Sequence, residues 1–272
     1  MRKLFIVLAL LALTMTACDG DAEPEPTPSP ITSENVGQLT MHQTIDEDET
    51  LYYTPNLRPD GGVVLLNVQS TSTYEATFTL YDTSTGETLW AVLGNDLWSV
   101  PGDAAASIVT FSPDGNHVLI TFSPLNGNDS QIVILDAANG KEIQRFDVPY
   151  MNHDAAYAAD GDLIIASMDD FDTADYRLLA LDATNGEVVG ELTVDSVILS
   201  LEARGNAVAY TTLDANVVVT FEHDADGVVF SEPIYNSEGG HFGYPAVSPD
   251  ASLVTLYDPD PVSYTHLRAH ET

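Results

Sequence analysis

The stretch FSPDGNHVLITF, residues 111–122, has the pattern of a tight turn between two strands. Pro113 presets the first corner of the turn, Asp114 can accept hydrogen bonds from the backbone that follows it, and Gly115 can take the left-handed conformation that other residues avoid. The alternating residues 117–122 then leave the turn with the two-residue period of a strand. The stretch therefore predicts a β-hairpin, and the fold depends on whether this hairpin recurs.

Two turn signals recur along the chain in a fixed order. The first reads RPDGG, SPDG, AADG, ARGN and SPDA in five copies, and the second reads DTSTGE, DAANGK, DATNGE and DADG in four. In three copies the two glycines lie 25 residues apart: Gly61 to Gly86, Gly115 to Gly140 and Gly161 to Gly186. The fourth copy, Gly205 to Gly227, is shorter by three residues. The same offset in three copies indicates a repeated structural unit.

Apolar runs flank the turns in a constant order. Runs such as HVLITF and DLIIASM follow the first turn, runs such as QIVILD and YRLLALD precede the second, and a short strand such as ETLWAV comes after it. With the strand before the first turn, each unit holds four antiparallel strands, and successive first turns lie 44 to 54 residues apart. This period predicts an all-β fold, a β-propeller built from four-stranded antiparallel blades.

The repeated units resemble blades of the WD-repeat and quinoprotein-like β-propeller superfamily, in which SPDG-type turns join the first two strands of a blade. By this resemblance the D-x-x-x-G turns join the last two strands. The resemblance covers about residues 31–261, and residues 31–45 resemble the entry segment that often completes the last blade in bacterial WD-repeat propellers. The chain lacks the Trp-Asp pair at strand ends, so the subfamily stays open.

The number of units predicts an incomplete ring. Four units are present, and a fifth stops near Asp258, just after its second strand. Propellers close with about four to eight blades, so we expect about four and a half blades here, as a fragment of a larger propeller. The final residues, 262–272, interrupt the strand rhythm and resemble a translated sequencing-adapter tail of the kind found on genes at the ends of metagenomic assemblies. We therefore expect that stretch to be non-native.

The chain begins like an exported bacterial lipoprotein. Arg2 and Lys3 precede an apolar run, residues 4–13, that is too short to cross a bilayer. The residues up to Cys18 resemble a lipobox, with Met15 where leucine is usual, which implies that residues 1–17 are removed as a signal peptide and that Cys18 carries the lipid. An ordinary secretory signal remains the alternative. Cys18 is the only cysteine, so no disulfide can form within the chain.

Residues 18–30 form an acidic, proline-rich linker that behaves as an extended spacer. We therefore expect the domain of residues 31–261 to be exported and anchored by lipid to the outer face of a bacterial membrane. The formal net charge is −34, from 42 acidic against eight basic residues. Such a charge repels nucleic acid and anionic headgroups, and it favours cations or basic partners. A surface adapted to salty water explains the same charge.

The sequence contains no nucleophile elbow, no phosphate-binding glycine loop and no zinc-ligand spacing. Trp90 resembles the blade-packing tryptophan of quinone-dependent dehydrogenases, but no cysteine remains for their active-site pair. Four scattered arginines in the domain argue against a sugar-acid or phosphate substrate. We therefore assign no catalytic, cofactor-binding or metal-binding residue and expect no cofactor.

Two features of the sequence have alternative interpretations: one acidic loop and one set of aromatic residues. The loop DDFDTAD, Asp169 to Asp175, offers hard oxygen ligands for calcium, although it lacks the glycine and distal glutamate of the twelve-residue motif. A solvated acidic loop is the alternative. Two roles are compatible with the aromatic residues considered: they form a binding patch on one face, or they pack in the core. These residues are Tyr52, Tyr53, Trp98, Tyr150, Phe242 and Tyr244.

Three functions remain in view. The leading prediction is a lipid-anchored propeller that binds a protein or peptide partner or acts as a scaffold, by analogy of fold. The first alternative is a propeller enzyme, a hydrolase or lyase, whose catalytic residues lie partly in missing blades. The second alternative is a structural lipoprotein of envelope assembly. Nothing in the sequence supports catalysis directly, so whether the protein is an enzyme stays uncertain, with a binding module preferred.

Overall fold

The computed structural model describes residues 51–70, 76–99, 104–124, 130–148, 151–170, 173–238, 245–248, 251–256 and 265–268. The chain divides into two units, Met1–Thr44 and Ile45–Thr272, and all described residues belong to the second. The predicted signal peptide, Cys18, the linker and the entry segment therefore lie outside the described residues. None of the helices within the described part is long and apolar enough to cross a membrane.

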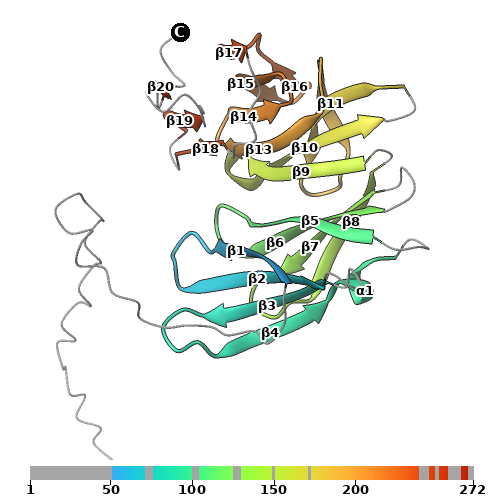
Figure 1. Cartoon of the computed structure of the whole chain (residues 1–272), viewed down its shortest axis with the longest axis vertical. Coiled ribbons are helices and arrows are strands. Elements are labelled where there is room, and N and C mark those ends of the chain that lie inside the picture. Colours follow the sequence, from blue (N-terminus) through green and yellow to red (C-terminus); the bar gives the residue numbers. More distant parts are fainter. Residues whose placement is uncertain are drawn as a thin grey trace, which may run out of the picture. The chain divides into compact units, whose positions relative to one another are not determined.

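Four antiparallel sheets, called blades 1 to 4 here, follow one another along the chain (Figure 1). Blade 1 consists of β1 (Leu51–Leu57), β2 (Val63–Ser70), β3 (Ala76–Asp82) and β4 (Thr88–Leu93). Blade 2 consists of β5 (Ala104–Phe111), β6 (His117–Pro124), β7 (Ser130–Asp136) and β8 (Glu142–Val148). Blade 3 consists of β9 (Met151–Ala158), β10 (Leu163–Asp170), β11 (Asp175–Asp182) and β12 (Val188–Val194). The predicted four-stranded antiparallel blades are thus confirmed.

Blade 4 and a fifth sheet depart from this regular pattern. Blade 4 consists of β13 (Ile198–Arg204), β14 (Ala207–Thr212), β15 (Ala215–Asp224) and β16 (Gly227–Phe230), and a fifth strand, β17 (Tyr235–Glu238), also pairs with β15. The last sheet consists of β18 (Ala246–Val247), β19 (Leu253–Leu256) and β20 (Thr265–Arg268). It has one strand more than expected, because β20 pairs with β19. The predicted non-native origin of residues 262–272 stays a prediction.

The two turn signals of each unit lie side by side at one end of the blade. In blades 1 to 3 a backbone N–H at the second turn donates to a backbone oxygen at the end of the first turn, and in blade 4 the donor is Phe221, which lies in β15 three residues before the strand ends. The bonds run from Thr83 to Gly62 (3.1 Å), Ala137 to Asn116 (2.9 Å), Ala183 to Asp162 (3.0 Å) and Phe221 to Asn206 (3.0 Å). Since this bond fixes where both turns end, it accounts for the constant offset between the two glycines.

The second turns close on their own aspartates. Asp82 Oδ1 accepts hydrogen bonds from the N–H groups of Ser84 (2.8 Å) and Thr85 (2.9 Å), and the N–H of Gly86 donates to the Asp82 oxygen (2.8 Å). Asp136 and Asp182 repeat this arrangement in blades 2 and 3. Blade 4 has a two-residue turn instead, in which Asp224 pairs directly with Gly227. The shorter turn accounts for one of the three residues by which the fourth copy is shorter, and the other two are missing between Gly205 and Asp224.

Successive blades pack through apolar side chains. Phe78 of blade 1 and Phe122 of blade 2 are fully buried and meet edge to face, with ring centroids 6.1 Å apart. Similar clusters join blade 2 to blade 3, blade 3 to blade 4, and blade 4 to the last sheet. Because each blade buries its apolar face against the next, no blade has a core of its own, which is the behaviour of a repeat protein.

An aromatic residue on an outer strand covers a glycine of the next blade. Trp90 of β4 is 9% exposed, and its Nε1–H donates to the Ala137 oxygen in blade 2 (2.9 Å). A Cβ at Gly140 would lie 2.8 Å from the Trp90 ring, so only glycine fits beneath it. Phe146 of β8 covers Gly186 of blade 3 in the same way. Trp90 therefore has the predicted role in packing between blades.

The first turn of blade 3 differs from its counterpart in blade 2. Pro113 cannot adopt a positive φ, whereas Ala159 at the same position has a φ of +46°. Asp160 (φ +56°) and Gly161 (φ +106°) follow it, as in the centre of a type I′ turn, and the N–H of Asp162 donates to the Ala159 oxygen (3.1 Å). The N–H of Ala159 then donates to the Gly205 oxygen in blade 4 (2.7 Å).

The glycine beneath Trp90 can be tested against a glycine of matched conformation. Gly140 has a φ of +69° and Gly61 has a φ of +72°, but a Cβ at Gly61 would meet nothing within 4 Å. We expect Gly61→Ala to lower the free energy of unfolding by about 1 kcal/mol through backbone strain alone. Gly140→Ala should lower it by about 2–4 kcal/mol, because the methyl group also displaces Trp90. Urea denaturation measures both, and equal losses would contradict the packing role.

The positive φ of Ala159 predicts that a substitution by glycine stabilises the protein. Ala159→Gly should raise the free energy of unfolding by about 1 kcal/mol, because glycine adopts a positive φ without steric cost. Ala138→Gly, in an exposed turn with negative φ, is the control and should lower stability by about 0.5 kcal/mol. Thermal unfolding of the two variants checks the sign, and a loss of stability in Ala159→Gly would contradict the left-handed conformation.

Candidate functional site

The turns of neighbouring blades meet at one face of the domain, which we call the turn face. It comprises the described residues 58–62, 82–87, 112–116, 136–141, 158–162, 182–187, 203–206 and 224–227. Within each blade the two turns are bonded to each other, as described above. Between blades, the N–H of Ala159 bonds to Gly205, and a Cβ at Gly115 would lie 2.8 Å from the Arg58 side chain. A Cβ at Gly161 would likewise lie 3.6 Å from Pro113, so the turns of all four blades adjoin one another on the turn face.

Carboxylates dominate the turn face. These residues include eleven acidic and three basic side chains, all of them at least partly exposed. The acidic residues are Asp60, Asp82, Glu87, Asp114, Asp136, Asp160, Asp162, Asp182, Glu187, Asp224 and Asp226. The basic residues are Arg58, Lys141 and Arg204, and two of these three are already paired, with Asp60 (2.8 Å) and Glu202 (3.4 Å) respectively. The face therefore carries a strong excess of negative charge.

Hydrogen bonds within the turns keep several of these carboxylates ionised. The hydroxyl of Ser84 and the backbone N–H groups beside it lower the pKa of Asp82. The hydroxyl of Ser112 (2.6 Å) and the N–H of Asn116 lower the pKa of Asp114. Because these donors bond to the charged form of each carboxylate, the turn face stays negative below the usual titration range of aspartate.

The Asp160 carboxylate, in the first turn of blade 3, does not accept a hydrogen bond from its own turn. Asp60 accepts a hydrogen bond from the N–H of Gly62 (2.9 Å), and Asp114 accepts one from the N–H of Asn116 (3.0 Å). Asp160, at the matching position in blade 3, accepts no hydrogen bond from any residue within the described ranges. Its turn closes through backbone groups instead, so the fold does not engage the Asp160 carboxylate.

A hollow of about 520 Å³ opens on the turn face between blades 3 and 4. Its lining comes from the first turns of both blades and from β15: Ala159, Asp160, Gly205, Asn206, Phe221, Glu222 and His223. The residues Asp160, Glu222 and His223 are exposed, whereas Phe221 is buried. The hollow thus presents two carboxylates and an imidazole from two blades, and its lining contains no lysine or arginine among the residues that the structure describes.

His223 also lies close to a carboxylate outside the lining. The pKa of Asp182 is lowered first by the hydroxyl and N–H of Thr184 and, to a smaller extent, by the electrostatic influence of His223. His223 therefore lines the hollow and also acts electrostatically on the second turn of blade 3. The negative charge around the hollow therefore extends beyond the residues that line it.

The acidic loop of blade 3 does not assemble a metal site within the described residues. Asp169 is fully buried in β10, and Asp175 pairs with Arg177 at the start of β11. Asp172 lies outside the described residues. No group of three or more histidine, cysteine, aspartate or glutamate side chains that could hold a metal ion occurs in the described part of the chain.

The remaining candidates fall on packing or outside the described residues. Trp98 packs against Phe122, with ring centroids 6.0 Å apart, and so belongs to the core between blades 1 and 2. The side chains of the other five candidate aromatics lie outside the described residues, as does Cys18. The hollow was not predicted from the sequence. Its only sequence signals are AADG in place of SPDG and the shortened DADG turn.

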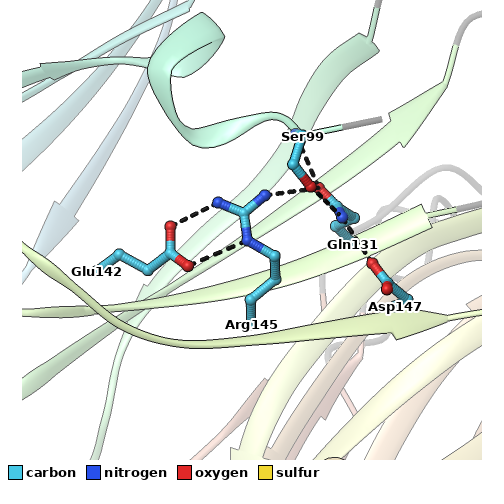
Figure 2. A network of polar contacts seen from close by, with 5 residues as sticks. All are labelled: Ser99, Gln131, Glu142, Arg145 and Asp147. Carbon is cyan, nitrogen blue, oxygen red and sulfur yellow. Dashed lines mark hydrogen bonds and ion pairs between the residues drawn. The ribbon is translucent and has the colours of Figure 1, made fainter. Parts of the chain in front are cut away.

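Arg58, Arg145, Arg177 and Arg204 are each engaged in an ion pair. Figure 2 shows Arg145 between Glu142 (3.1 and 2.5 Å) and the Gln131 oxygen (3.0 Å). Gln131 Nε2 donates in turn to Ser99 Oγ (2.7 Å) and to Asp147 Oδ1 (2.6 Å). The bond to Glu142 raises the pKa of Arg145. This network ties the segment after α1 (Gly94–Leu97) to blade 2, so we interpret it as structural.

Comparisons with known proteins identify the fold but neither a family nor a function. No family model matches the chain, and neither does any curated protein. A chain of the mitotic checkpoint complex is similar with a TM-score of 0.50 and 13% identity, over 83% of this chain and 80% of that one. Its similarity and the four-stranded blades together show a β-propeller fold.

Two further structures are more distant. Hydrazine synthase of Kuenenia stuttgartiensis matches with a TM-score of 0.49 and 19% identity, over 74% of this chain and 60% of that one. TolB of Acinetobacter baumannii matches with a TM-score of 0.44 and 21% identity, over 70% of this chain and 44% of that one. The chain therefore spans less than two thirds of the length of both. The comparisons thus give distant structural similarity to a β-propeller through the checkpoint chain alone, with no sequence family.

Proposed function

We propose that this protein is a lipid-anchored, extracytoplasmic binding module that holds a positively charged protein or peptide on its turn face. The observation that carries the proposal is the ratio of eleven acidic to three basic side chains on that face. Complementary charge speeds association and rejects partners of the same sign. A basic segment of a partner is therefore the ligand class that fits this surface.

The rigidity of the turns supports the same proposal. The second turns of blades 1 to 3 are closed by backbone N–H groups that donate to Asp82, Asp136 and Asp182, and in these blades the two turns are also bonded to each other. Side chains held by such bonds lose little freedom when a ligand arrives, so less of the interaction energy is spent on ordering them. A preorganised acidic surface suits recognition of a flexible basic segment.

The anchor is the second part of the proposal. Cys18 carries the lipid, and residues 18–30 hold the domain away from the membrane. An extended proline-rich spacer of this length reaches roughly 40 Å. The net charge of −34 gives the domain no attraction to anionic headgroups, which leaves the turn face free for a basic partner.

Binding can be measured with a short fluorescent peptide of alternating arginine and glycine. The mature chain bearing Cys18→Ser should bind it at low salt and lose affinity by about tenfold or more between roughly 50 and 500 mM NaCl, because salt screens exposed charges. The same peptide with citrulline in place of arginine is the neutral control. Equal binding of both peptides, or no binding of either, would overturn the proposal.

The affinity for the arginine–glycine peptide should fall at low pH, when the carboxylates of the turn face become protonated. Asp82, Asp114 and Asp182 have lowered pKa values, so their charge is present above the ordinary carboxylate pKa and is lost only as the pH falls through the folded values. Peptide affinity should therefore hold from pH 7 to about 5 and decline below about 4. Fluorescence anisotropy follows it, with circular dichroism to confirm folding. A loss of affinity between pH 7 and 5 would contradict the assignment to these carboxylates.

The anchor has its own test in a bacterial host. The wild-type chain should sediment with membranes and incorporate labelled palmitate, whereas Cys18→Ser should do neither, because the thiol is the attachment point. Met15→Leu, which restores the usual lipobox residue, is the matched control and should behave like the wild type. Unlabelled, soluble wild-type protein would contradict the lipid anchor and leave the ordinary secretory signal.

A further inference from the structure

We propose that the hollow between blades 3 and 4 is the seat for one guanidinium group, an arginine side chain of the basic partner. This inference rests on the proposed function and names the chemistry of one position within it. The supporting observations are the size of the hollow, the carboxylates that the fold leaves unused, and the two departures from the repeat that create it.

The size of the hollow fits a side chain better than a bare ion. Its volume of about 520 Å³ lies in the range of roughly 300–1,000 Å³ that small-molecule sites occupy, whereas one water molecule needs only about 30 Å³. The described residues also offer no group of three or more ligands that could close around a metal ion. An organic cation is therefore the ligand class that the space admits.

The carboxylates of the hollow are available to a ligand. Neither Asp160 nor Glu222 accepts a hydrogen bond from the described residues, in contrast to Asp60 and Asp114 in the neighbouring first turns. A ligand can therefore bond to them without breaking a turn. Arg204, the cation nearest in sequence to the hollow, is directed to Glu202 (3.4 Å) and does not line it.

Two departures from the repeat meet at this place. In blade 3, the absence of proline lets Ala159 take a positive φ, and its N–H bonds to Gly205 across the hollow's edge. In blade 4, β15 continues for three residues beyond Phe221 before its short turn, so Glu222 and His223 stand on a strand where blades 1 to 3 have an aspartate-closed turn. Neighbouring blades thus differ from the repeat on the two sides of one hollow.

A guanidinium matches these groups better than an ammonium does. It carries five N–H donors in a plane and can bond to two carboxylates at once, and charge-assisted bonds of this kind are among the strongest in proteins. Asp160 and Glu222 approach from different blades, and the amide of Asn206 lies in the lining with them. These groups supply acceptors on more than one side of the site.

The test uses arginine amide as the probe and citrulline amide as its neutral counterpart. Titration of the mature chain bearing Cys18→Ser, followed by amide NMR shifts, should show arginine amide perturbing the residues around the hollow and citrulline amide leaving them unchanged. Asp160→Asn and Glu222→Gln should each weaken binding by roughly tenfold, since each removes a charge-assisted bond. Asparagine tolerates positive φ, so Asp160→Asn should keep the turn intact.

Asp162→Asn is the matched control, because Asp162 lies two residues away, is exposed, and does not line the hollow. It should leave the affinity for arginine amide within about twofold of the wild type, because an exposed carboxylate that does not line the hollow makes no direct bond to the ligand and contributes little through solvent. If it weakens binding as much as Asp160→Asn does, the effect is one of general charge and the inference is wrong.

The arginine–glycine peptide separates this inference from the proposed function. If the peptide binds the wild type and the Asp160→Asn/Glu222→Gln double variant equally, the proposed function stands and the hollow is not the seat. If arginine amide binds the hollow but the peptide does not bind, the turn face is not a docking surface for a basic segment, while the guanidinium site itself is supported. If neither ligand binds, both proposals are overturned.

Discussion

One backbone hydrogen bond, from the residue after the second turn's aspartate to the end of the first turn, sets the level at which blades 1 to 3 end, and in blade 4 the same bond starts from Phe221, three residues before β15 ends. It recurs as Thr83 to Gly62, Ala137 to Asn116, Ala183 to Asp162 and Phe221 to Asn206. A polar backbone group left without a partner at this point costs about 1–3 kcal/mol, so both turns are held to the same end. The turn face, and any binding site on it, therefore depends on this hydrogen bond.

The aromatic–glycine contact then joins one blade to the next. Trp90 over Gly140 and Phe146 over Gly186 require a second turn with no side chain at its glycine, and the same glycine has a positive φ of +69° or +75°. One residue thus satisfies the turn and the packing together. Blade 4 has no such turn, and there Gly190 of β12 lies against Val228 instead. The regular packing therefore ends where the hollow begins.

The fold was predictable because the information for it is local and repeated. Gly115, Gly140 and their counterparts mark turns whose conformations follow from residue type, and their constant offset follows from the bond between the turns. The hollow was not predictable in this way. AADG reads as one more copy of the first turn, and only the structure shows that Ala159 adopts a conformation closed to Pro113, which leaves Asp160 unused.

The charge of the chain also has two different roles that composition alone does not separate. A carboxylate such as Asp82 or Asp182 already accepts several hydrogen bonds, so a ligand that approaches it competes with the turn that it closes. A carboxylate such as Asp160 or Glu222 has lost no acceptor capacity to the fold. Long-range attraction depends on both kinds, because it depends on total charge. Specific recognition depends on the second kind, and Asp160 and Glu222 line the hollow where two neighbouring blades depart from the repeat.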